Sequence, residues 1–127
     1  MEITYAELIG SIRALETLSK RRVPVAGALA VRRLMRQVQG HLADYHAVRK
    51  GLLDRHAEHD ERGHIRQGDA GQALFADEAA QQAFIAEQRA LLAEKVMLDD
   101  WLTVDRLGTD PIEPEVLLAL GSLLQEE

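Results

Sequence analysis

The sequence contains no cysteine and no long apolar run. Without cysteine the chain can form no disulfide, thiolate nucleophile or Cys-ligated metal site, and this composition suits a reducing compartment. Its longest apolar run, Val116–Leu120, is far shorter than the roughly 20 residues that a bilayer span needs. The first residues also lack the basic and then apolar pattern of a secretory signal. We therefore expect a soluble, cytoplasmic chain with no membrane partner.

Sequence motifs of catalytic or cofactor-binding sites are scarce as well. Asp99 and Asp100 are adjacent, so on a strand they would face opposite sides. Gly63, Gly68 and Gly71 lack the lysine and the strand-turn-helix setting of a phosphate-binding loop. The few hydroxyl residues form no nucleophile pattern with a histidine. These absences predict a protein that is not an enzyme and that holds no cofactor.

What the sequence does contain is helical periodicity, within a length of 127 residues that suits one domain. Thr4 and Glu7 form a capping box at the start of a helix predicted over residues 5–19, with Ile3 and Leu8 as a hydrophobic staple. Pro24 suits the first turn of a second, long helix. In this helix, apolar residues from Val31 to Leu52 follow alternating spacings of four and three, with Arg49 in the one gap, and the helix is expected to extend to about His59. Its two internal glycines are places where it could bend.

The remainder of the chain predicts smaller elements. Residues 60–73 have no helical periodicity and indicate a loop, with a short strand around His64 to Arg66. A third helix is predicted from Asp77 to Lys95, one or two short strands within residues 96–104, and a last helix from Pro114. No internal repeat is evident. The predicted fold is a single, mainly α domain with a helical hairpin, one long helix, two further helices and a possible short β-hairpin.

The net charge of −6 is unevenly distributed. Up to Arg55 the chain carries a charge of +5, and from His56 onward it carries −11. A basic group near the start of the long helix could contact a polyanion such as nucleic acid. Its members are Lys20, Arg21, Arg22, Arg32, Arg33 and Arg36. No aromatic residues are interleaved with them for base stacking, so we favour the alternative in which this basic face pairs with the acidic second half.

Histidines gather at the end of the long helix. His56 and His59 share one helical face and His64 follows shortly after, which could place nitrogen ligands around a metal ion. However, histidines near a helix C-terminus are also favoured by the helix dipole. We therefore favour a solvated helix end and expect no metal.

The long helix also suggests a protein-binding surface. Its distal apolar residues lie beyond the reach of the shorter first helix, so they require a cover from elsewhere. These residues are Tyr45, Val48, Leu52 and Leu53. The third helix could cover them, or they could bind a partner or a second copy, with Trp101 as a further contact anchor. A homo-oligomer or a docked subunit is the expectation.

Several segments together resemble a family of small uncharacterised proteins of tailed bacteriophages and prophages. The segments that carry the resemblance are Leu15-Glu16-Thr17-Leu18 before Val23-Pro24-Val25, Tyr45 with Arg49 and Leu52-Leu53, Asp60-Glu61-Arg62-Gly63, Glu94-Lys95-Val96-Met97-Leu98, and Ile112-Glu113-Pro114-Glu115-Val116-Leu117-Leu118-Ala119-Leu120. The resemblance implies a phage gene product located in the host cytoplasm or the virion, and it supplies no catalytic residues. The first hypothesis is therefore a non-enzymatic virion or tail-assembly component, or a host-directed accessory factor, that binds protein. The alternative is a nucleic-acid-binding module using the basic connector between the first two helices.

Overall fold

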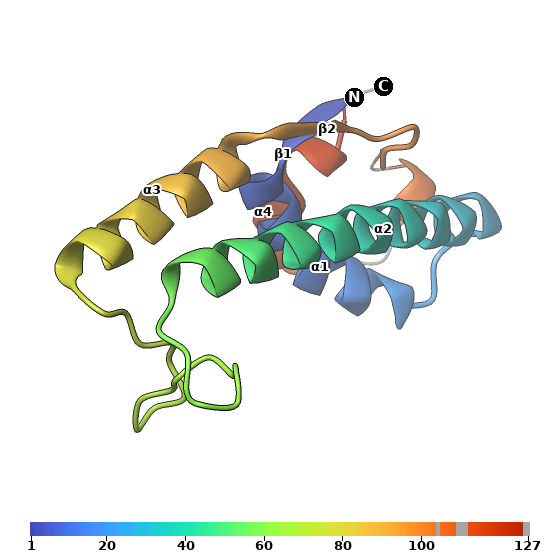
Figure 1. Ribbon diagram of the computed structural model, residues 1–127. Helices are drawn as coiled ribbons and strands as arrows, with labels where there is room; N and C mark the ends of the chain where they lie inside the picture. Colours follow the sequence, from blue (N-terminus) through green and yellow to red (C-terminus); the bar gives the residue numbers. More distant parts are fainter. Residues whose placement is uncertain (104, 109–111, 126–127) are drawn as a thin grey trace. The chain divides into compact units, whose positions relative to one another are not determined.

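The computed structural model describes residues 1–103, 105–108 and 112–125. The fold is mainly helical, as predicted, and a two-stranded antiparallel sheet accompanies the helices (Figure 1). The elements in chain order are β1 (Glu2–Thr4), α1 (Tyr5–Ser19), α2 (Val25–His56), α3 (Glu78–Ala93), β2 (Lys95–Met97), the 3-10 turn η1 (Asp105–Leu107), α4 (Pro114–Leu120) and the 3-10 turn η2 (Gly121–Leu123). They form two compact units. Unit 1 comprises Met1–Ala43 and Glu94–Glu127, and unit 2 comprises Asp44–Ala93, so α2 contributes to both.

The start of α1 follows the capping signals in the sequence. The Thr4 Oγ1 atom accepts a hydrogen bond from the Glu7 N–H at 3.2 Å, and Ile3 and Leu8 are both buried in the core. The Glu7 carboxylate also accepts hydrogen bonds from the hydroxyls of Ser122 at 2.6 Å and Thr4 at 3.1 Å. The Ser122 hydrogen bond is the main reason that the pKa of Glu7 is lowered from its ordinary value, because it stabilises the ionised form. The predicted cap is therefore confirmed, and it also joins α1 to η2.

The long helix α2 is continuous through Gly40 and Gly51, so neither glycine ends the helix. It ends at His56 rather than near His59. Pro24 precedes the helix instead of lying within its first turn, and its carbonyl accepts the Ala28 N–H at 2.9 Å. Close packing fixes the first turn of the helix. A Cβ atom on Gly27 would overlap the Arg106 carbonyl oxygen, so only glycine fits beside η1.

The sheet is antiparallel as predicted, but its strands do not form a hairpin. β1 pairs with β2 through Glu2 with Met97, Ile3 with Val96 and Thr4 with Lys95, so the N-terminal strand lies beside the segment after α3. Leu102 instead forms an isolated parallel bridge with Leu124. A strand of three residues is too short to show the alternation of apolar and polar residues that marks a strand, so β1 could not be predicted from the sequence. Val104, predicted to be strand-like, lies outside the described residues.

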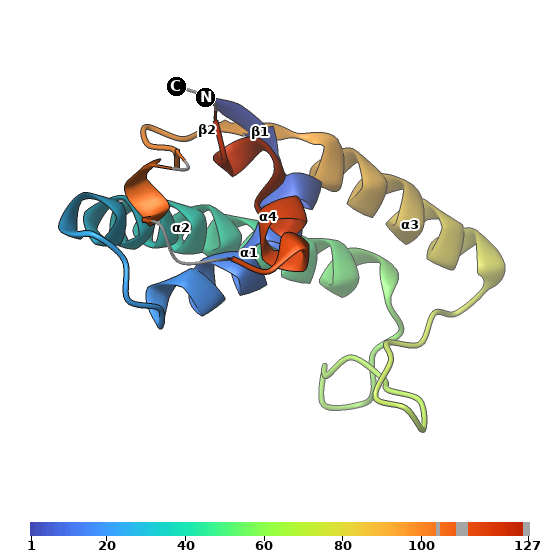
Figure 2. The ribbon, with the colours of Figure 1, turned by 180° about the vertical axis from the view of Figure 1, so that it is seen from behind.

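The core of unit 1 consists largely of leucines from distant parts of the chain. α1 and the first half of α2 bury their facing apolar residues in it, and α4 packs along α1 (Figure 2). Leu120 from α4 and Leu123 from η2 are 1% and 0% exposed. Burying one such side chain completely stabilises the fold by about 2 kcal/mol. The last helix therefore closes this core, as the sequence predicted.

Unit 2 contains an internal repeat of eight residues between α2 and α3. Glu58, Arg66 and Leu74 are joined in a cycle of backbone hydrogen bonds: the Arg66 N–H donates to the Glu58 carbonyl at 2.8 Å, Leu74 to Arg66 at 2.9 Å and Glu58 to Leu74 at 2.8 Å. Isolated antiparallel bridges flank the cycle, joining Ala57 with Phe75, His59 with Ile65, and Gln67 with Ala73. The strand predicted at 64–66 is thus one arm of a three-armed arrangement that we call the octad region, residues 57–75.

The two turns of the octad region repeat the same geometry. Gly63 and Gly71 both have positive φ, 80° and 78°, and each donates its N–H to the carbonyl three residues earlier at 3.0 Å. This repeat is one of backbone geometry, and it does not contradict the absence of a repeat in the amino-acid sequence. The repeat escaped notice because it lies in backbone geometry and in the spacing of two glycines, whereas most of the intervening side chains differ.

The third helix begins one residue later and ends earlier than predicted. Asp77 caps it, since its Oδ1 accepts the Ala80 N–H at 2.8 Å. The helix ends at Ala93 because Lys95 already belongs to β2. Phe84 is its buried residue, and the Phe84 ring centroid lies 5.4 Å from that of Phe75 in the octad region.

Candidate protein-binding groove

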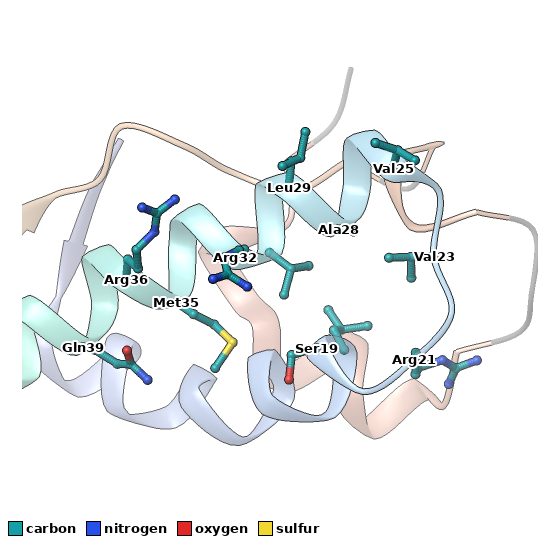
Figure 3. Close-up of a pocket in the computed structure, with 12 residues that line it drawn as sticks. Ser19, Arg21, Val23, Val25, Ala28, Leu29, Arg32, Met35, Arg36 and Gln39 are labelled. Carbon is teal, nitrogen blue, oxygen red and sulfur yellow. The ribbon is translucent and has the colours of Figure 1, made fainter.

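A groove of about 590 Å³ lies in unit 1 between the end of α1, the connector and the first turns of α2 (Figure 3). We call it the α1–α2 groove. Its lining residues are Leu18, Ser19, Arg21, Val23, Val25, Ala28, Leu29, Val31, Arg32, Met35, Arg36 and Gln39. Leu18 and Val31 are buried and also belong to the core, so the deepest part of the groove is fixed by the packing of α1 against α2.

The mouth of the groove exposes an apolar surface. Val25 is 77% exposed and Leu29 is 47% exposed, while Val23 and Met35 are half-buried. Val25 and Leu29 lie four residues apart, so they share one face of α2. The core-facing residues of α2, Leu34 and Val38 among them, occupy another face. A side chain from another molecule that covered Val25 and Leu29 would remove this apolar surface from water.

Three arginines also line the groove. Arg32 and Arg36 come from successive turns of α2 and Arg21 from the connector, as Figure 3 shows. Arg21 forms an ion pair with Glu113 at 2.9 Å. Arg32 and Arg36 are exposed, and neither has an ion-pair partner among the residues that the structure describes. The groove therefore combines an apolar surface with two exposed arginines.

The other basic candidates lie outside this groove. Lys20, Arg22 and Arg33 are not among its lining residues, and Lys20 lines a separate depression together with Arg13, Glu16 and Arg21. Within the described parts of the chain, Arg21 alone of the six pairs with the acidic second half. The favoured pairing of the basic face with the acidic second half is thus observed at Arg21, and the other five form no ion pair with any residue that the structure describes.

The predicted protein-binding residues of α2, all in unit 2, differ in exposure. Tyr45 and Leu52 are only 5% and 8% exposed, so the expectation that these two need an external cover is wrong. Leu53 is half-buried and lines a cavity of about 520 Å³ with Phe75 and Phe84, residues of the octad region and of α3. Val48, 50% exposed, remains accessible.

Trp101 is 42% exposed and lies in a turn rather than on an edge strand. Its backbone N–H donates to Asp100 Oδ1 at 2.9 Å, and its carbonyl accepts from Arg106 at 3.3 Å. Arg106 also forms an ion pair with Asp100 at 3.3 Å. These contacts fix the backbone of the turn, so the indole is held at the surface of unit 1.

The histidine candidates are not brought together. His56 Nε2 lies 3.3 Å from Glu87 Oε2, without the alignment of a hydrogen bond, and His59 Nε2 lies 4.0 Å from Asp54. The exposed His64 takes part in the octad region through its backbone. Among residues 1–103, 105–108 and 112–125, no three metal-ligating side chains form a group that could hold an ion.

The sequence contained a signal for the groove that was not used. Val25, Leu29, Arg32 and Arg36 follow spacings of four, three and four, which mark one face of a helix. The longer apolar series farther along α2 is the stronger periodic pattern in this part of the sequence. An apolar pair outside a core-facing series, flanked by arginines on the same face, would have identified it.

Comparisons of the chain with models of protein families, with curated proteins and with solved structures find no match. In the described parts of the chain, no helix combines the length and the apolar character needed to cross a membrane.

Proposed function

We propose that this chain is a non-enzymatic protein that acts by binding another protein chain through the α1–α2 groove. The observation that carries the proposal is an apolar surface, Val25 and Leu29, exposed at the mouth of a groove beside two exposed arginines. Covering an exposed leucine or valine contributes about 1 kcal/mol or more to binding. Arginines at the edge of such a surface add orientation and a preference for acidic partners.

The resemblance to phage and prophage proteins supports a specific setting for this binding. In that setting the chain is a virion or tail-assembly component, or an accessory factor directed at a host protein, and it resides in the host cytoplasm or the virion. Both roles need a stable surface that recognises protein, which the groove supplies. Mass spectrometry of purified particles separates them, because an assembly component that remains in the virion is detected there.

The groove is tested by affinity capture with two matched variants. Leu29→Ser removes apolar surface inside the groove without adding charge, and Val48→Ser makes the same kind of change at a similarly exposed residue of unit 2. We expect a specific partner to be retained by the wild-type chain and by Val48→Ser, and lost from Leu29→Ser. Equal retention by both variants would contradict the proposed use of the groove.

A nucleic-acid-binding module is the second candidate, because Arg32 and Arg36 are exposed and have no ion-pair partner among the described residues. Phosphate contacts depend on charge and not on Leu29. Labelled duplex and single strands should be titrated at about 0.15 M salt, where screening is near physiological. Submicromolar binding that Arg32→Gln with Arg36→Gln abolishes and Leu29→Ser leaves unchanged would favour this second function.

A further inference from the structure

The outer face of α4 is the chemical complement of the α1–α2 groove. Leu118 is 82% exposed, more than any other large hydrophobic residue among those described. Glu115 and Ala119, three residues before and one after it, are also exposed, so α4 presents an apolar side chain with a carboxylate one turn away. This face is fixed in place, since Leu120 on the opposite side of α4 is buried in the core of unit 1.

The charges of the two surfaces are opposite. Glu115 has no ion-pair partner among the described residues, and the same holds for Arg32 and Arg36 beside the groove. Within one chain the two surfaces do not meet, because Leu118 does not line the groove and remains exposed. Each molecule therefore offers one acidic apolar face and one basic apolar groove, both in unit 1.

We propose that the occupant of the α1–α2 groove is α4 of a second copy of this chain. Leu118 of one copy packs against Val25 and Leu29 of the next, and Glu115 approaches Arg32 or Arg36. This inference rests on the proposed protein-binding function and names the partner. Opposite charge and two exposed apolar surfaces on one rigid unit are the observations that favour a second copy over an unrelated protein.

The contact joins two different surfaces, so it is heterologous. A heterologous contact repeats from copy to copy and produces a closed ring or an open filament, unlike the two-fold contact of a simple dimer. Every copy inside such an assembly uses both its groove and its α4 face. Assemblies larger than a dimer are therefore expected.

Analytical ultracentrifugation with complementary variants tests this arrangement. Leu118→Ser leaves the groove intact, and Leu29→Ser leaves the α4 face intact. Wild-type protein should assemble further as concentration rises, whereas each variant alone should associate at least about tenfold more weakly. A mixture of the two should form a heterodimer and stop there, because only one working groove and one working α4 face remain. Val48→Ser should assemble like the wild type, and circular dichroism should show unchanged helix in all variants.

Exchanging the charges of Glu115 and Arg32 tests independently how α4 is aligned in the groove. Glu115→Arg and Arg32→Glu should each weaken assembly. Both substitutions in one chain should restore it, since every contact then joins the same two opposite charges in exchanged places. A wild-type chain that stays monomeric, or Leu118→Ser that assembles like the wild type, overturns the proposal.

Partner capture distinguishes a failure of this inference from a failure of the proposed function. Loss of capture in Leu29→Ser but not in Leu118→Ser would show that the groove binds another protein, so the inference would be overturned and the proposed function would survive. Unchanged capture in Leu29→Ser would contradict the proposed function itself.

Discussion

The two units of this chain are each stabilised by a different kind of interaction. In unit 1, leucines from α1, α2, α4 and the segments between them reach exposures of 0% or 1%, as at Leu34 and Leu123. In unit 2, described throughout, the most buried apolar residues are 5% to 8% exposed, and the octad region is organised by backbone hydrogen bonds and two glycines. Apolar burial dominates the stability of unit 1, whereas backbone geometry has a larger share in unit 2. We infer that unit 1 is the rigid frame on which a binding surface can be maintained.

The largest expected effect is a difference in stability loss between two leucine substitutions in α2, one in each unit. Leu34 and Leu52 both belong to α2, but Leu34 is 0% and Leu52 is 8% exposed. We expect Leu34→Ala to lower the free energy of unfolding by about 4 kcal/mol and Leu52→Ala by about 2 kcal/mol. The loss is larger at Leu34 because truncating the more deeply buried side chain leaves a cavity that the surrounding residues fill less well. Urea denaturation measures both values. An equal or larger loss at Leu52 would refute the proposed difference between the units.

A smaller effect should appear at the octad glycines. Gly71 has a φ of 78°, where a side chain is strained, so Gly71→Ala should cost about 1 to 2 kcal/mol. Gly40 lies inside α2, and a Cβ added there would meet no atom within 4 Å beyond its chain neighbours and the nearby helix backbone, so Gly40→Ala should stabilise the protein by about 0.5 to 1 kcal/mol. Hydrogen exchange should show faster exchange at the Gly71 amide and its neighbours in the first variant only. Slower exchange there would mean that the turn does not depend on glycine.

A still smaller effect concerns the link between α1 and η2. The pKa of Glu7 is lowered chiefly by the Ser122 hydroxyl, so ionised Glu7 stabilises the fold above its unfolded pKa near 4.5. That contribution is lost as the pH falls through the lower, folded pKa. Because Glu7 is largely exposed, solvent screening limits it to about 0.5 kcal/mol.

Ser122→Ala should therefore be slightly less stable than the wild type at pH 7, and the difference should narrow below about pH 4. Thermal unfolding at a series of pH values measures this difference. Thr17→Ala serves as a control, since the Thr17 hydroxyl donates to the Arg13 carbonyl within α1. A difference that widened in acid would show that the Ser122 contact does not favour ionised Glu7.

No effect is expected from a metal chelator. His56 and His59 each approach one carboxylate, and His64 has an exposed side chain. These residues do not assemble a closed ligand set within the described residues. The melting temperature should be unchanged by chelation. Stoichiometric zinc in protein purified without an affinity tag, or a large drop in melting temperature, would contradict this prediction.

Local structure could be predicted well from the sequence, whereas contacts between distant segments could not. The capping box at Thr4 and the extent of α1 depend on neighbouring residues, so the sequence alone indicates them. The pairing of β1 with β2 depends on two three-residue segments far apart in sequence, which no periodicity can connect.

The candidate site was predicted only in part. Arg21, Arg32 and Arg36 were selected for their charge, and all three line the groove. Val25 and Leu29 were not selected as site residues. Their exposure depends on which face of α2 packs against the core, and the sequence, which has two apolar faces in this helix, does not show which of them is buried. Tyr45 and Leu52 were expected to need a cover because the first helix is too short to reach them, and the structure buries both.

Site-specific photo-crosslinking in the cell that makes the protein tests the central claim most directly. A crosslinking amino acid at position 29 reports on the groove, and one at position 48 reports on a similarly exposed site in unit 2. The account predicts discrete protein adducts at position 29, with mass spectrometry locating the contact in residues 115–119 of a second copy, and no discrete adduct at position 48. Adducts at position 48 with none at position 29 would contradict the claim that this groove is where the chain binds protein.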